Sequence, residues 1–338
     1  MKKIKNIIED TKKVLASQIG GKKSCGALLY LVFSDFIIRA STPLFERIKQ
    51  LSYKAINSCK STGNELLVDF CLPEFIETFH EWLQKDDSHR SKFPLIARVD
   101  GSKLGRHYGE QIPELKKLYD YVNNCYINTH EIYVLLISFG QKDFIGGYKI
   151  KRKDEELGTN KIAQDLLENF CNSLPKDLQK EFKKWCRIAL DGAWGNGTML
   201  EWLEKKDYSN IAIKSGGTNK IINSHDETFN SLKNYEDYLI EELNKGTIRW
   251  LTFNPCHKLF GCLYYSTLIR FANSGMEVRI TILKYTKKDK NRYLMLLALP
   301  QDDWHPFRIV QTYKGRWAIE TMFRTCKHSF NGKIFISL

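Results

Sequence analysis

The chain has 338 residues and a formal net charge of +13, from 52 Lys and Arg against 39 Asp and Glu. Hydrophobic residues make up 43% and charged residues 27%, a balance typical of globular proteins that excludes a disordered chain, a collagen-like fibre and a bundle of membrane spans. The surplus of positive charge indicates a polyanionic partner, first of all nucleic acid, although an anionic membrane surface or solubility alone would also explain it.

The N-terminal segment and the cysteines indicate the cellular compartment of the protein. The start, residues 1–5, is basic but no apolar run follows it, and the apolar stretch 26–33 is shorter than the about 20 residues that cross a bilayer. Nine cysteines without a C-x-x-C pair favour a reducing compartment, and the group Cys256, His257 and Cys262 is typical of buried thiols. We therefore expect a cytoplasmic protein with no membrane partner.

The N-terminal part of the chain, residues 1–90, has a helical pattern. Apolar residues recur at spacings of three and four, as in Phe45, Ile48, Leu51 and Ile56, and later in Phe75, Phe79, Trp82 and Leu83. The polar segment 86–91 predicts a linker at its end.

From residue 91 onward, short apolar segments alternate with helical patterns, which predicts an α/β sheet. The expected strands are 93–100, 132–139, 187–192 and 208–214. The expected helices are 115–126, 164–174, 178–184 and one that begins at a capping box formed by Thr198 and Glu201.

A β-rich block follows at 218–302. A polar helical segment leads into four expected strands, at 248–253, 267–271, 278–285 and 293–299. We interpret this block as an insertion into the α/β domain, because a helical pattern returns at 307–329 and closes the chain. The predicted organisation is a helical region 1–90, a core in two parts, 91–217 and 303–338, and the insertion 218–302.

Polar residues gather on one face of the last helix. At roughly 100° per residue an arc of about 80° holds one carboxylate, three cations and a phenol, while the opposite side is apolar. These residues are Tyr313, Arg316, Glu320, Arg324 and Lys327. A solvated face with i,i+4 ion pairs would explain the same pattern.

Two aspartates favour a functional site over a solvated helix face. Asp100 and Asp191 each end an apolar strand and precede a glycine, and sites in open α/β sheets lie at the carboxyl ends of strands. An Asp-Gly pair taken alone is more typical of a turn. Together with Glu320, however, the two can hold two divalent cations about 4 Å apart, the arrangement used for in-line displacement at phosphorus. Mg²⁺ suits these hard oxygen ligands, and Mn²⁺ can substitute.

The spacing of the last-helix residues is similar to a family signature. Tyr313-x2-Arg316-x3-Glu320-x6-Lys327 resembles the Tyr-Arg-Glu-Lys signature of bacterial DDE transposases of the insertion-sequence-four type. Residues 190–196 and 99–102 resemble the family's two aspartate segments. The resemblance covers roughly 91–330. It implies a ribonuclease-H-like core with a β-rich insertion between the second aspartate and the glutamate.

The resemblance also implies roles for individual residues. Asp100, Asp191 and Glu320 would be the catalytic residues and would bind two Mg²⁺ ions. The residues expected to contact DNA are Tyr313, Arg316, Arg324, Lys327 and Trp250. Trp250 in the insertion is the candidate for stacking on a flipped base, although a Trp in the buried core is the more common case.

The implied function is cut-and-paste transposition. The protein would cleave insertion-sequence ends and join them to target DNA, with region 1–90 on the terminal repeats and a homodimer in the synaptic complex. The bacterial nucleoid would be its location. The chain stops eleven residues after Lys327, where the family continues into a longer helical C-terminus. We therefore also expect, as alternatives, a truncated remnant that only binds DNA or a nuclease that cuts without joining.

Overall fold

The computed structural model describes residues 62–106, 116–120, 124–139, 142–151, 156–253, 262–287, 290–300 and 305–329. The expected helix around Phe45 and the group Cys256–His257 lie outside these residues. In the described residues, no helix is long and apolar enough to cross a membrane.

The strands form one mixed, twelve-stranded sheet, which confirms the predicted α/β class. The strands are β1 (Leu95–Arg106), β2 (Lys116–Asp120), β3 (Cys125–Phe139), β4 (Lys142–Lys151), β5 (Arg187–Leu190), β6 (Asn210–Lys214), β7 (Ile221–Ile222), β8 (Thr228–Phe229), β9 (Leu251–Thr252), β10 (Leu263–Phe271), β11 (Glu277–Lys287) and β12 (Lys290–Ala298). Their order is β2-β3-β1-β5-β6-β12-β11-β10-β7-β8, with β4 beside β3 and β9 beside β10.

The centre of the sheet is parallel. β1, β5 and β6 run side by side in the same direction, and β3 and β4 continue the sheet on the other side of β1 as antiparallel strands. β5 and the start of β1 are nearly continuous apolar runs because both faces of the sheet are covered there. The register pairs Val99 of β1 with Leu190 of β5, so Asp100 and Asp191 follow at the same level of two neighbouring strands.

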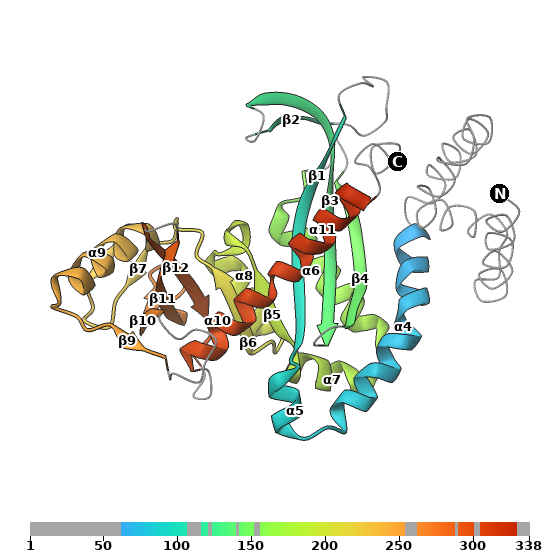
Figure 1. Ribbon diagram of the computed structural model, residues 1–338, viewed down its shortest axis with the longest axis horizontal. Helices are drawn as coiled ribbons and strands as arrows, with labels where there is room; N and C mark the ends of the chain where they lie inside the picture. The colour runs from blue at the N-terminus through green and yellow to red at the C-terminus, as the bar shows by residue number, and fades with distance from the viewer. Residues whose placement is uncertain are drawn as a thin grey trace, which may run out of the picture.

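Helices cover both faces of this central part (Figure 1). The helices are α4 (Thr62–Leu83), α5 (Asp87–Lys92), α6 (Thr159–Ser173), α7 (Lys176–Trp185), α8 (Gly197–Lys205), α9 (Leu232–Lys245), α10 (Pro306–Gly315) and α11 (Trp317–Ser329). α4, α6, α7 and α8 share one hydrophobic core with the sheet, in which Phe75 and Phe79 of α4 are fully buried. α10 and α11 pack on the opposite face, where Ile309 and Ile319 are buried.

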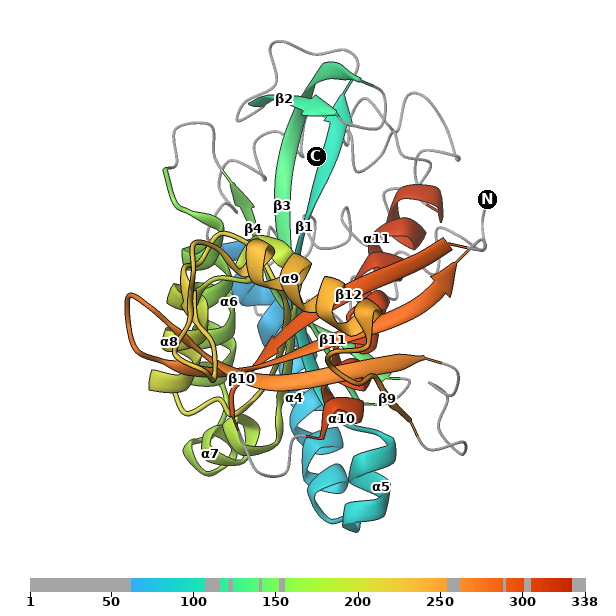
Figure 2. The same ribbon diagram turned by 90° about the vertical axis from the view of Figure 1, so that its left-hand side faces the viewer.

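The β-rich block continues the same sheet (Figure 2). β12 pairs antiparallel with β6, with Leu297 opposite Ile213, so the block is joined to the core by hydrogen bonds between strands. α9 covers this half of the sheet and buries Leu232, Leu239 and Leu243 in the same core as β11. The predicted strands of the block are present, with β9 shorter than expected.

Several local predictions are wrong. Segment 115–126 is not a helix: β2 and the start of β3 pair there, with Tyr119 opposite Tyr126, because pairing between strands outweighs the weak helical pattern. The linker 86–91 is mostly helix α5, which Asp86 caps by accepting a hydrogen bond from the His89 N–H. Helix α8 begins earlier than the capping box predicts, because the Asn196 side chain caps it at Met199.

The expected last helix is two helices. α10 ends at Gly315 and α11 begins at Trp317, with Arg316 at the junction. Gly315 packs so closely on β1 that a Cβ there would lie 2.7 Å from Cδ1 of Ile96. The break between the two helices therefore lies next to a close contact between the chain and β1.

Candidate active site

Asp100 lies on β1 on the face that α11 covers. Its neighbours in sequence at even positions, Ile96 and Arg98, lie on the same face, and Arg98 and Gly315 are in contact. The Gly101 N–H donates a 2.8 Å hydrogen bond to Oδ1 of Asp100. A Cβ at Gly101 would lie 2.8 Å from the Tyr133 ring, so close packing requires glycine at this position.

Asp191 follows β5 and begins a 3-10 turn, Gly192–Trp194. The turn is held from two sides. The buried indole of Trp194 donates a 3.1 Å hydrogen bond to the carbonyl of Thr159 at the start of α6. On the other side, a Cβ at Gly195 would lie 2.0 Å from the Lys214 carbonyl, so only glycine allows this turn to pack on the end of β6.

Asp100 does not end its strand as predicted, because β1 stays paired with β3 as far as Arg106; only Asp191 follows the end of a strand. The helix junction brings Tyr313, Arg316 and Glu320 to these two aspartates. The Tyr313 hydroxyl donates a 3.2 Å hydrogen bond to Oδ1 of Asp191. Nη1 of Arg316 lies 3.3 Å from Oδ2 of Asp100, and Nη2 of the same guanidinium donates to Oε1 of Glu320. The structure thus brings together five of the residues that the sequence predicts. Arg316 lies at the centre of the group and is 9% exposed.

The electrostatics of the site follow from its burial. The pKa of Asp100 is raised to about 6, mainly by burial; the Gly101 N–H and Arg316 lower it, and the carboxylates of Asp191 and Glu320 raise it. Burial and then Asp191 raise the pKa of Tyr313 to about 12, so its hydroxyl keeps its proton at neutral pH. Three carboxylates share one buried guanidinium, and the site is therefore short of positive charge.

The chemistry of the donors suits a hard divalent cation, but their present arrangement does not form a metal site. Among the described residues, no three His, Cys, Asp or Glu side chains lie close enough together to hold an ion. Arg316 bonds both Asp100 and Glu320. The guanidinium thus takes the place of a cation between these two carboxylates, and metal binding would require it to move.

Three further residues are predicted for the site, Arg324, Lys327 and Trp250. Arg324 and Lys327 lie further along α11, and their side chains are outside the described part of the chain. Trp250 lies in the β-rich block, where its ring stacks on Tyr293 at 6.3 Å between centroids and Nζ of Lys284 lies 5.5 Å from the ring. This is the packing position that a core Trp would have, and its stacking on a base stays a prediction.

Two basic residues near the site are not among the predicted site residues. Lys214 is exposed at the end of β6, and its side chain lies beside Gly192. Arg98 is buried under the helix junction. The position of Lys214 at the end of an apolar strand, like that of Asp191 just after one, is a signal in the sequence that indicates it. Arg98 sits inside an apolar run, and nothing in the sequence indicates what it contacts.

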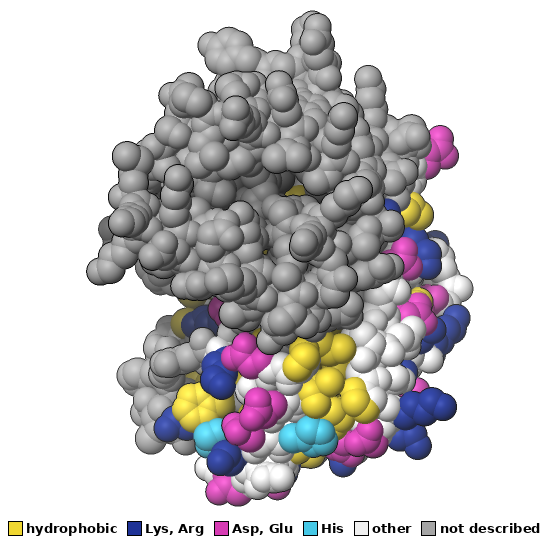
Figure 3. All heavy atoms as spheres, turned by 90° about the vertical axis from the view of Figure 1, so that its right-hand side faces the viewer, with side chains coloured by type: hydrophobic (Ala, Val, Ile, Leu, Met, Phe, Trp, Pro, Cys, Tyr) yellow, Lys and Arg dark blue, Asp and Glu magenta, His cyan; other side chains and the backbone are white. Residues whose placement is uncertain are grey.

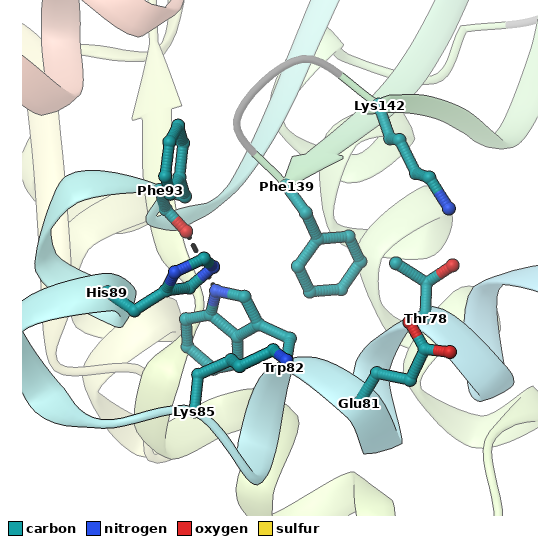
Figure 4. A pocket seen from close by; sticks show the side chains of 8 residues that line it. All are labelled: Thr78, Glu81, Trp82, Lys85, His89, Phe93, Phe139 and Lys142. Atoms are coloured by element: carbon teal, nitrogen blue, oxygen red, sulfur yellow. Dashed lines mark hydrogen bonds between the residues drawn. The ribbon is translucent and has the colours of Figure 1, made fainter.

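A hollow elsewhere on the molecule does not involve these residues. It has a volume of about 350 Å³ and lies between α4, α5 and the end of β3 (Figure 4). Trp82 and Phe139 form its apolar wall, and the Trp82 indole donates a 2.7 Å hydrogen bond to the carbonyl of Phe93. Among the described residues that are visible on this side of the molecule, acidic and basic side chains are interspersed around a small apolar patch (Figure 3).

Comparisons with known proteins assign no family to this chain. No protein-family model and no curated protein matches the sequence. Among solved structures, the chain is similar to the NurA nuclease from Sulfolobus solfataricus, at 9% sequence identity over 76% of this chain and 94% of that chain. The TM-score of that match is 0.29, too low to support an inference about fold or activity.

Proposed function

We propose that this protein cleaves DNA strands with a divalent metal ion, at a site built from Asp100, Asp191 and Glu320. One observation carries the proposal: Asp100 and Glu320 both contact the guanidinium of Arg316, and Asp191, which follows the parallel strand next to β1, accepts a hydrogen bond from Tyr313 of the same helix pair. Solvent-exposed ion pairs along a helix would not place Asp100 and Asp191 beside Arg316. The alternative of a merely solvated helix face is therefore less favoured.

The charge of the site supports the need for a metal. A DNA phosphate is an anion, and three carboxylates around one buried guanidinium would repel it. Divalent cations held by Asp100, Asp191 and Glu320 would reverse the sign of the site. Bound there, Mg²⁺ would supply an activated water and neutralise charge that develops on the phosphate. Mn²⁺ has the same preference for oxygen ligands and is a practical probe.

The residues of the chain have separate tasks in this proposal. Tyr313 orients Asp191 through its hydrogen bond. If these carboxylates held a metal, Arg316 would be released from Asp100 and Glu320 and would be available for a bidentate contact with a DNA phosphate. Lys214, at the end of the neighbouring strand, is the second candidate for a phosphate contact. Arg324 and Lys327, which come later in α11, would contact DNA phosphates beyond those held by Arg316.

The finer proposal is a DDE transposase with a ribonuclease-H-like core. It is supported by the Tyr-Arg-Glu-Lys spacing and by the order β4-β3-β1-β5-β6, in which the two aspartate-bearing strands are parallel neighbours. A β-rich block between Asp191 and Glu320 agrees with the family's insertion. A nuclease that cuts without joining would use the same carboxylates, so only the products distinguish the two.

The test is a product analysis with supercoiled plasmid and a labelled duplex that ends in a 3′-hydroxyl. With Mg²⁺ or Mn²⁺ we expect nicked plasmid and labelled duplex joined to plasmid, and neither product with EDTA or with Glu320→Gln. Nicking without joining would support the nuclease. Binding without any nicking, in either metal and at any pH from 6 to 9, would support a remnant and overturn the proposal.

A further inference from the structure

Arg98 is a buried cation beneath the junction of α10 and α11. It is 4% exposed and lies on β1, two residues before Asp100. Its Nε donates to the backbone carbonyl of Gly315, the last residue of α10. Its Nη1 donates to the hydroxyl of Ser138 on β3, and that hydroxyl in turn donates to the carboxylate of Asp143 on β4. A polar chain thus runs from the exposed Asp143 to the helix junction.

Space filling alone does not require an arginine at this position. Burial lowers the pKa of Arg98 to about 10 in spite of the favourable charge of Asp143, which shows that the guanidinium is poorly solvated. A buried ion pair replaced as a whole by apolar side chains of similar volume often costs no stability, so a buried charge is weak evidence for a stabilising role. What an apolar residue cannot provide is a donor for the Gly315 carbonyl. Carbonyls in the last turn of a helix have no partner within that helix.

The contact fixes the backbone where the two helices meet. Gly315 lies against β1, since a Cβ there would meet Cδ1 of Ile96 at 2.7 Å and Nη2 of Arg98 at 3.4 Å. Arg316 is the next residue, and Glu320 lies about one helical turn after it. β1 therefore carries both Asp100 and Arg98. Arg98 holds the helix junction from which Arg316 and Glu320 reach the site.

We propose that Arg98 is a positioning residue for the acidic site. Together with Ser138 and Asp143 it anchors the Gly315 carbonyl on β1, so that Arg316 and Glu320 face Asp100 at a fixed distance. This inference rests on the proposed DNA cleavage. A misplacement of about 1 Å at a reacting centre can reduce the rate about 100-fold, so a lost anchor would affect the maximal rate much more than DNA affinity.

The test compares Arg98→Met with a matched control. Arg187 is a half-buried arginine on the next strand, and it contacts α10 through Gln311 at 3.4 Å, away from the junction. We expect Arg98→Met to lower the maximal cleavage rate at saturating protein about 100-fold and to leave the Kd for DNA within about threefold. Arg187→Met should keep the cleavage rate, whatever it does to the melting temperature. Arg98→Lys should restore part of the rate, because one ammonium can donate to Gly315.

A second readout does not depend on cleavage. Hydrogen exchange of the amides from Arg316 to Ser329 should be faster in Arg98→Met than in wild type, while the α6 amides keep their rates. If Arg98→Met does not fold, Ser138→Ala and Asp143→Asn replace it, with the same direction and a smaller effect. An unchanged cleavage rate in a folded variant, equal losses in Arg98→Met and Arg187→Met, or unchanged exchange in α11 would overturn the proposal. Wild-type protein without cleavage activity would overturn the proposed function instead, and the exchange of α11 would still decide whether Arg98 anchors the junction.

Discussion

The hydroxyl of Tyr313 donates a hydrogen bond to Oδ1 of Asp191, 122 residues earlier in the chain and 3.2 Å away. The bond joins α10 to the end of β5. Because the pKa of Tyr313 is raised to about 12, the phenol acts as a donor throughout the physiological pH range. It leaves Oδ2 of Asp191 for other partners, and it sets the orientation of the carboxylate.

Tyr313→Phe should therefore lower both stability and cleavage. The ring is retained, so packing changes little, and the loss of one hydrogen bond should reduce the free energy of unfolding by about 1 kcal/mol. Cleavage should fall because Asp191 is free to rotate. Urea unfolding and a nicking assay measure the two effects. Tyr293→Phe, which removes a hydroxyl that contacts Asn244 in the β-rich block, is the matched control and should keep full cleavage. Equal cleavage by the two variants would contradict an orienting role.

The raised pKa of Asp100 makes a prediction about stability and pH. The carboxyl has a pKa of about 6 in the folded protein, above its ordinary value of 3.8. Between these values the folded state binds more protons than the unfolded state, so this group makes stability fall as pH rises from about 4 to about 6. Above pH 6 the charged, buried Asp100 costs up to about 3 kcal/mol.

Asp100→Asn should remove that cost. The variant is expected to be more stable than wild type at pH 7 to 8, by about 1–3 kcal/mol, and the difference should vanish toward pH 4. Urea unfolding of both proteins from pH 4 to 8 gives the difference directly, and titrating groups that do not interact with Asp100 cancel in it. A constant difference across this range would show that Asp100 does not titrate as the structure indicates.

Arg316 and a divalent cation should compete for the same carboxylates. In Arg316→Gln the positive charge between Asp100 and Glu320 is lost, so Mn²⁺ should bind at least tenfold tighter at pH 8, a gain of about 1.4 kcal/mol or more. DNA affinity should fall, and its salt dependence should weaken by about one phosphate contact. Calorimetric titration with Mn²⁺ and DNA binding at several salt concentrations measure these effects. Weaker Mn²⁺ binding in the variant would mean that Arg316 supports the metal rather than excluding it.

The parts of the fold that the sequence predicts well are those with a strong local pattern. The runs ending in Asp100 and Asp191 are strands because parallel central strands are apolar on both faces. The helix predicted over segment 115–126 is wrong because these residues form strands only by pairing with the chain that follows them. A pairing of that kind is decided in three dimensions and leaves little trace in a local window.

In the candidate site, too, local patterns predict some residues, and long-range contacts decide the rest. Spacing in the C-terminal segment identifies Tyr313, Arg316 and Glu320, and the structure places Tyr313 beside Asp191 and Arg316 beside Asp100. The break at Arg316 was not predictable, because it depends on how closely Gly315 approaches Ile96 of β1. Nor was the role of Arg98, whose partners lie 40 and 217 residues away in sequence.

The most direct test of the central claim is strand cleavage by Asp191→Asn measured beside DNA binding. The account predicts that wild type nicks duplex DNA in Mg²⁺, and that the variant binds DNA as tightly or more tightly, because a negative charge near phosphate is removed, but does not cleave it. Tyr313 can still donate to the amide oxygen, so the fold should be retained. Cleavage by a pure, folded Asp191→Asn protein at the wild-type rate would contradict the claim that Asp100, Asp191 and Glu320 form one catalytic site.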